Sequence, residues 1–93
     1  MSDPLHVAEV TVFEKSPAQG YCPQCVAVLR NLPKLGVDFD TEYLDTPEGE
    51  AVIERAKANG GQSAPITRIV YSDGSEKLVS GNNMPAIKEA LNV

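Results

Sequence analysis

The two cysteines of this 93-residue chain, Cys22 and Cys25, are the residues whose chemistry most constrains its function. They lie two residues apart in the stretch GYCPQC, residues 20–25, and the chain has no other cysteine. Cysteine pairs with this spacing serve as structural disulfides, as half of a metal site, or as redox pairs that alternate between dithiol and disulfide. Most of what the sequence says about function depends on which of these roles applies.

A structural disulfide and a zinc site are both poorly supported by the rest of the chain. Closing a four-residue ring removes little entropy from the unfolded chain, roughly 2 kcal/mol in the chain-entropy model. A structural zinc site needs four ligands, and the chain offers only two thiols and one imidazole, His6. We therefore predict no metal site within one chain, while a zinc ion shared between two chains stays open as an alternative.

Redox exchange fits the expected position of the pair at the start of a helix. Pro23 suits a first helical turn, and apolar residues recur with helical spacing from Val26 to Leu32. Cys22 would then face the free N–H groups and the positive dipole end of the helix, which favour thiolate over thiol. Cys25, one turn further on, is placed to attack a mixed disulfide formed at Cys22.

The rest of the chain reads as strands and helices that would position this pair. The strands are expected at 8–13, 37–44, 65–71 and 76–79, and the helices at 23–35, 47–58 and from about 85 onward. The first helix is expected to kink or loosen at Pro33 before Gly36 ends it.

This order, β-α-β-α-β-β-α, predicts a single α/β domain spanning residues 1–93, with a four-stranded mixed sheet flanked by three helices. Strands joined through helices are expected to be parallel neighbours, and a hairpin at 72–75 adds an antiparallel edge.

Charge and hydropathy exclude several classes of partner. The net charge is −5 and the Lys and Arg residues are dispersed, which argues against nucleic acid or an anionic membrane surface. The chain has no apolar run near the length of a membrane span, and residues 1–6 show no features of a secretory signal. We expect a cytoplasmic protein, in a compartment where static disulfides are rare.

Three groups of residues resemble the glutaredoxin branch of the thioredoxin superfamily, and the match spans nearly the whole chain. Cys22-Pro23-Gln24-Cys25 opens the first helix. Ser63-Ala64-Pro65-Ile66 is similar to the segment in which the family keeps a cis-proline beside the active site. Ser80-Gly81-Asn82-Asn83 is similar to the small-residue turn before the last helix, and the element order is also that of glutaredoxins.

Within that branch, Gln24 and the Ser80-Gly81 pair resemble the NrdH-type redoxins, small dithiol proteins that pass electrons from thioredoxin reductase to ribonucleotide reductase. The resemblance implies a dithiol–disulfide oxidoreductase with those two proteins as partners. It implies no bound cofactor, since the cysteine pair carries two electrons that come ultimately from NADPH through the reductase. We expect a monomer.

Two departures from the family pattern keep alternatives open. NrdH-type proteins usually carry a Trp just before the Ser-Gly pair, where this chain has Leu78-Val79. Glutathione-using members typically place an Asp at the start of the last helix, where Asn82 and Asn83 stand here. The asparagines lack the charge of that Asp, which argues against glutathione without excluding it. A glutathione-dependent glutaredoxin is the first alternative, and a redox-inactive binding module with a thioredoxin fold is the second.

The resemblance also implies roles for individual residues. Cys22 would be the nucleophile and Cys25 the resolving thiol. Pro65 would take a cis bond and present the backbone of Ala64 to an extended peptide or thiol substrate. Lys15 resembles the lysine that closes the first strand and helps to hold the thiolate. The remaining residues expected at the partner-binding groove are Tyr21, Pro23, Gln24, Ser63, Gly81, Asn82 and Asn83.

The loop before the cysteines is longer than in the family. Six residues, 16–21, separate Lys15 from Cys22, whereas glutaredoxins usually have two or so. This loop is therefore expected to bulge or curl, and its function is open.

Overall fold

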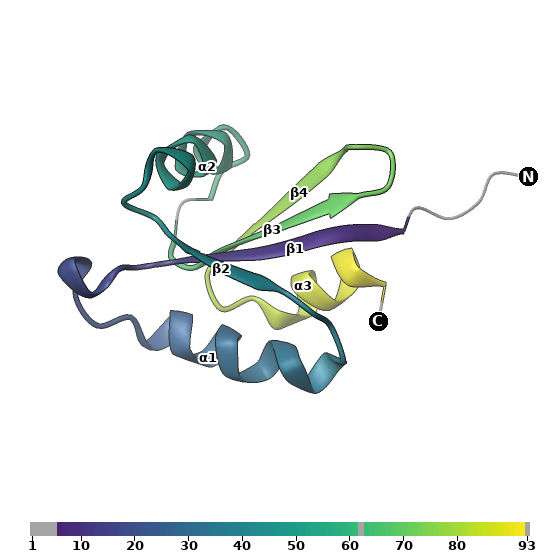
Figure 1. The fold of residues 1–93 in the computed structure, drawn as a ribbon, viewed down its shortest axis with the longest axis horizontal. Coiled ribbons are helices and arrows are strands. Elements are labelled where there is room, and N and C mark those ends of the chain that lie inside the picture. Colours follow the sequence, from purple (N-terminus) through teal and green to yellow (C-terminus); the bar gives the residue numbers. More distant parts are fainter. Residues whose placement is uncertain (1–5, 62, 93) are drawn as a thin grey trace, which may run out of the picture.

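The computed structural model describes residues 6–61 and 63–92. Most of residues 1–6, which were used to predict a cytoplasmic protein, lie outside the described residues. The predicted order of elements is confirmed (Figure 1). The elements are β1 (Val7–Glu14), α1 (Pro23–Asn31), β2 (Asp40–Tyr43), α2 (Pro47–Ala58), β3 (Ile66–Tyr71), β4 (Glu76–Ser80) and α3 (Met84–Leu91), with 3-10 turns η1 (Pro17–Gln19) and η2 (Leu32–Leu35). None of the described helices is long and apolar enough to cross a membrane.

The strands form one mixed sheet in the order β2-β1-β3-β4. As predicted, β1 and β2 are parallel neighbours across α1, and the hairpin of β3 and β4 is antiparallel. The prediction was wrong for β2 and β3, which are joined through α2 but are not neighbours, and β3 runs antiparallel to β1.

The register explains why the crossover rule fails at α2. Ile66, the first residue of β3, pairs with Phe13 near the end of β1. Tyr43, the last residue of β2, pairs with the adjacent Glu14. The chain thus enters α2 and leaves it at the same end of the sheet, so β3 must run in the opposite direction to β2.

The helices cover both faces of the sheet, which gives three layers (Figure 1). Because neighbouring residues of a strand point to opposite faces, Val12 and Phe13 serve different cores. Val12 packs with α1 and α3 in a cluster that includes Val28 and Ile87. Phe13 packs with α2 in the second cluster. The sequence-based α/β fold class, with its four strands and three helices, is confirmed for the described residues.

The first helix loosens where the proline predicts it. Regular α-helix ends at Asn31, and the chain continues through Pro33 as the 3-10 turn η2 until Gly36, whose φ of 72° is left-handed. Strand β2 is shorter than the predicted 37–44, because pairing with β1 begins only at Asp40.

Candidate active site at the start of helix α1

Cys22 is the N-cap residue of α1. Its backbone is extended, with φ −128° and ψ 94°, and Pro23 follows at the first helical position. The Cys25 N–H donates a hydrogen bond of 3.1 Å to Cys22 Sγ, so the sulfur takes the place of the usual capping oxygen. No acidic residue lies in the first turn of α1. A thiolate on Cys22 would therefore meet the positive end of the helix without a competing carboxylate from that turn.

The two cysteines form a disulfide, with their Cα atoms 5.3 Å apart. Cys25 is buried, with 2% of its surface exposed, whereas Cys22 is only partly buried. An incoming thiol or disulfide therefore reaches the Cys22 sulfur first, and Cys25 lies behind it. This asymmetry supports Cys22 as nucleophile and Cys25 as resolving thiol, and both roles stay predictions.

The segment around Pro65 lies next to the cysteine pair. The Ala64–Pro65 peptide bond is cis, as the resemblance implies. The Gly81 N–H donates to the Ser63 carbonyl at 3.0 Å and to the Pro65 carbonyl at 2.7 Å, which ties the turn after β4 to this segment. A Cβ atom built on Gly81 would lie 3.6 Å from both Gln24 Oε1 and Ser63 Cβ. The three groups of residues that carry the resemblance therefore meet at one place.

A groove of about 480 Å³ lies beside the disulfide, and every residue that lines it was a predicted site residue. We call it the disulfide groove, and its lining residues are Lys15, Tyr21, Cys22, Pro23, Gln24, Ser63 and Ala64. Lys15 lines the groove together with Cys22, although six residues separate them. Part of the intervening loop is coiled into the η1 turn. The expectation that the loop curls is confirmed.

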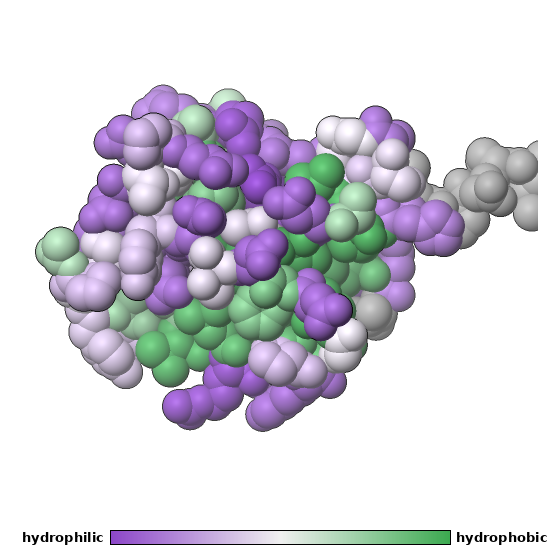
Figure 2. Space-filling view, in the orientation of Figure 1, coloured by the Kyte–Doolittle hydropathy of each residue, from purple (hydrophilic) through white to green (hydrophobic). Residues whose placement is uncertain are grey.

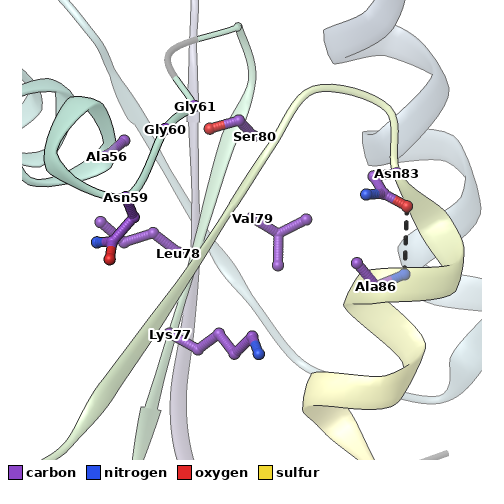
Figure 3. A pocket seen from close by; sticks show the side chains of 10 residues that line it. All are labelled: Ala56, Asn59, Gly60, Gly61, Lys77, Leu78, Val79, Ser80, Asn83 and Ala86. Carbon is purple, nitrogen blue, oxygen red and sulfur yellow. Dashed lines mark hydrogen bonds between the residues drawn. The ribbon is translucent and has the colours of Figure 1, made fainter.

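Asn82 and Asn83 do not line the disulfide groove. Asn83 is the N-cap of α3 and accepts a hydrogen bond of 3.3 Å from the Ala86 N–H through Oδ1 (Figure 3). Its side chain also lines a separate cavity of about 250 Å³ between the end of α2, β4 and α3. Helix capping thus accounts for Asn83, and the partner contacts predicted for both asparagines stay predictions.

A second cavity, of about 320 Å³, lies beside the disulfide and was not predicted. Its walls include Pro17 and Val26, and both Cys22 and Cys25 contribute to it. The unusual length of the loop was the signal in the sequence, but the loop's path could not be deduced from it. Among the described residues, no group of three or more His, Cys, Asp or Glu side chains is placed to hold a metal ion.

A three-layer α/β fold with a cysteine pair at the start of its first helix and a cis-proline beside that pair defines a thioredoxin-like redoxin. Neither a protein-family model nor a curated protein matches the chain. Solved structures do. The glutaredoxin of Archaeoglobus fulgidus is 31% identical, with a TM-score of 0.61 over 92% of this chain and 88% of its own. The glutaredoxin of Methanosarcina mazei Go1 is 28% identical, with a TM-score of 0.65 over 91% of this chain and 79% of its own. The chain belongs to the glutaredoxin family.

Proposed function

We propose that this protein is a dithiol–disulfide oxidoreductase of the NrdH type, which accepts electrons from thioredoxin reductase and passes them to ribonucleotide reductase. One observation carries the catalytic part of the proposal. The partly exposed Cys22 sulfur caps α1, and the buried Cys25 is bonded to it from the same helical turn. This arrangement can receive a partner sulfur at Cys22 and then release it.

The exchange follows from these positions. In the reduced protein, the Cys22 thiolate attacks one sulfur of a substrate disulfide, forms a mixed disulfide and releases the other substrate sulfur as a thiolate. The Cys25 thiolate then attacks Cys22 Sγ, closes the internal disulfide and releases the second substrate thiolate. Two electrons leave the protein, and the released thiolates take up two protons. The reductase reverses the process with electrons from NADPH, so no bound cofactor is needed.

The choice of the NrdH type rests on particular residues. Gln24 and the Ser80-Gly81 pair match that pattern, and Gly81 packs beside Gln24 at the disulfide groove. The Asp with which many glutaredoxins hold the glutathione amine is replaced by Asn, and Asn83 already caps α3. We also propose that the protein is a monomer and that it acts in the cytoplasm. A reducing compartment returns the cysteine pair to the dithiol form after each exchange.

A glutathione-dependent glutaredoxin is the second candidate, and Lys15 is the observation that favours it. Lys15 lines the disulfide groove together with Ser63 and Ala64. An ammonium group at that position could pair with a carboxylate of glutathione.

Two electron sources separate the candidates in one assay. Reduction of a disulfide substrate is followed by NADPH consumption, with either thioredoxin reductase or glutathione plus glutathione reductase. We expect turnover with thioredoxin reductase, and adding ribonucleotide reductase as the final acceptor should then yield deoxyribonucleotides. Turnover in the glutathione arm alone would contradict the NrdH assignment.

Alkylation tests the redox role itself. In the reduced protein at pH 6, Cys22 should react with iodoacetamide faster than a free peptide thiol, because the helix start favours its thiolate. A rate equal to that of the free thiol would favour a redox-inactive binding module.

A further inference from the structure

The second cavity owes its outer wall to the long loop before the cysteines. We call it the η1 cavity, and its lining is mixed: the polar residues are Glu14, Lys15 and Ser16, and the others that matter here are Pro17, Tyr21, Cys22, Cys25 and Val26. Lys15, Tyr21 and Cys22 also line the disulfide groove, whereas Pro17, Cys25 and Val26 line only the η1 cavity. The disulfide thus lies between two hollows, one built by the Pro65 segment and one built by this loop.

The loop that forms this wall is anchored to the body of the protein. The Ser16 hydroxyl, in a side chain that is almost fully buried, donates to Asp45 Oδ2 at 2.6 Å, between residues 29 positions apart in the sequence. The Ser16 N–H donates to Gln19 Oε1 at 2.9 Å, and the Gln19 N–H donates to the Ser16 carbonyl at 2.9 Å. Because these bonds fix the wall before a partner arrives, binding there costs little further ordering.

The η1 cavity also gathers exposed apolar side chains. Among the described residues, the large hydrophobic side chains that are exposed are Tyr21 at 80%, Tyr43 at 44% and Val26 at 38%. Two of these three line the η1 cavity. In the view of Figure 2, hydrophobic surface extends along the α1 side of the molecule, whereas the α2 side is mainly hydrophilic. Apolar side chains left in water beside a reacting group mark a contact surface.

We propose that the η1 cavity binds an apolar side chain, best an aromatic one, next to the reacting cysteine of a protein substrate. The inference rests on the proposed function and names its substrate class. Because Cys22 lines both hollows, a polypeptide whose cysteine is bonded to Cys22 can lay its backbone in the disulfide groove and place a neighbouring side chain at the mouth of the η1 cavity. A cavity of roughly 150 Å³ can accommodate a benzene ring, so a volume of about 320 Å³ admits an aromatic side chain.

The cavity thereby distinguishes protein substrates from glutathione. The cysteine of glutathione is flanked by a γ-glutamyl group and a glycine, and neither offers an apolar side chain to Tyr21, Val26 and Pro17. A protein that places Phe, Tyr or Leu beside its cysteine gains contacts with Tyr21, Val26 and Pro17.

Two disulfide-linked peptide dimers test the inference. They are identical except that the cysteine is flanked on both sides by phenylalanine in one and by glycine in the other. The protein is reduced, freed of reductant and mixed with each dimer, and the second-order rate constant for peptide thiol release is measured in a single turnover. We expect the phenylalanine dimer to react about tenfold faster, since burial of part of one aromatic ring is worth that factor.

Variants then assign the preference to the cavity. Val26→Asn puts a polar amide on the wall without adding charge, and it should reduce the ratio of the two rate constants to about threefold or less. Tyr43→Ala is the matched control, because Tyr43 is similarly exposed and lines neither hollow, and it should keep the wild-type ratio. A ratio near one in the wild type, or an unchanged ratio in Val26→Asn, would overturn the inference and leave the proposed function standing. Reduction of neither dimer would overturn both.

Discussion

The starts of helices α1 and α2 share a capping pattern, but the cap of α1 is a reactive cysteine and the cap of α2 is a threonine. Each has an extended cap residue followed by proline, Cys22-Pro23 in α1 and Thr46-Pro47 in α2. In each, the cap side chain accepts a hydrogen bond from the N–H three residues on. The distance is 3.1 Å from Cys25 to Cys22 Sγ, and 3.0 Å from Gly49 to Thr46 Oγ1. The two capping distances are nearly the same. The capping atom differs, and so does the cap backbone, with ψ 94° at Cys22 and 163° at Thr46.

The residues around the two caps also differ, and this difference bears on reactivity. The first turn of α2 carries Glu48 and Glu50, whose carboxylates offset the helix dipole, and Glu48 also pairs with Arg68 at 2.9 Å. Gly49 is buried against the backbone of Leu44, so that position has no room for a side chain. The first turn of α1 has no acid and opens onto two hollows. A helix start becomes a reactive site when its cap is a nucleophilic sulfur and its first turn carries no carboxylate to offset the dipole.

Replacing the sulfur cap with an oxygen cap should have the largest effect. Cys22→Ser keeps a capping hydroxyl but removes the nucleophile, so disulfide reduction should fall on the order of a thousandfold or more. The free energy of unfolding, measured with denaturant under reducing conditions, should change by less than about 1 kcal/mol relative to the reduced wild type. A variant that still reduced disulfides would show that α1 does not owe its chemistry to its cap.

Adding a side chain at Gly49 in the first turn of α2 should have the next largest effect. A Cβ atom at Gly49 would lie 2.7 Å from the backbone carbon of Leu44, so Gly49→Ala should destabilise the protein by about 2 kcal/mol or more. The sign of the change in unfolding free energy is informative, because Gly→Ala at a helix position with free space stabilises by up to about 1 kcal/mol. Unfolding in urea measures the effect. A more stable variant would mean that the Gly49 position has room for a methyl group.

Removing the oxygen cap of α2 should have a smaller effect. Thr46→Ala leaves the Gly49 N–H without its acceptor and should cost about 1 kcal/mol of unfolding free energy, whereas Thr46→Ser should keep most of it. Peptide-disulfide reduction should be unchanged in both variants, since Thr46 lies outside both hollows beside the disulfide. Loss of reduction in either variant would contradict the functional separation of the two helix starts.

Giving α1 the acidic first turn of α2 should have the smallest effect. A carboxylate near a helix start interacts with the dipole by about 0.3–1 kcal/mol. In the reduced protein, Gln24→Glu should therefore raise the pKa of the Cys22 thiol and slow its alkylation at pH 6 about two- to fivefold at low salt. Gln24→Lys is the matched control and should not slow it. Equal rates for the wild type and Gln24→Glu would argue against the role of an uncompensated dipole.

Features that depend on a few neighbouring residues were predictable from the sequence. The helix start at Cys22-Pro23, the loosening at Pro33 and the cap at Thr46 each follow from contacts within about four positions of the chain. The cis bond before Pro65 followed from the resemblance. The direction of β3 was predicted wrongly, because the crossover rule assumes that a connecting helix carries the chain back along the sheet, and α2 does not.

The sequence by itself therefore determined the chemistry, namely a cysteine pair at a helix start, and the set of elements around it. Only the tertiary structure decided what surrounds the sulfur. The Ser16–Asp45 hydrogen bond and the packing of Gly81 beside Gln24 join segments that are far apart in the chain. The second hollow is lined by residues 14–26 alone, but the loop that forms it is held by the Ser16–Asp45 bond. Such contacts depend on how the whole chain packs. Residues close together in the sequence determine where a helix begins, whereas its contacts depend on the packing of distant segments.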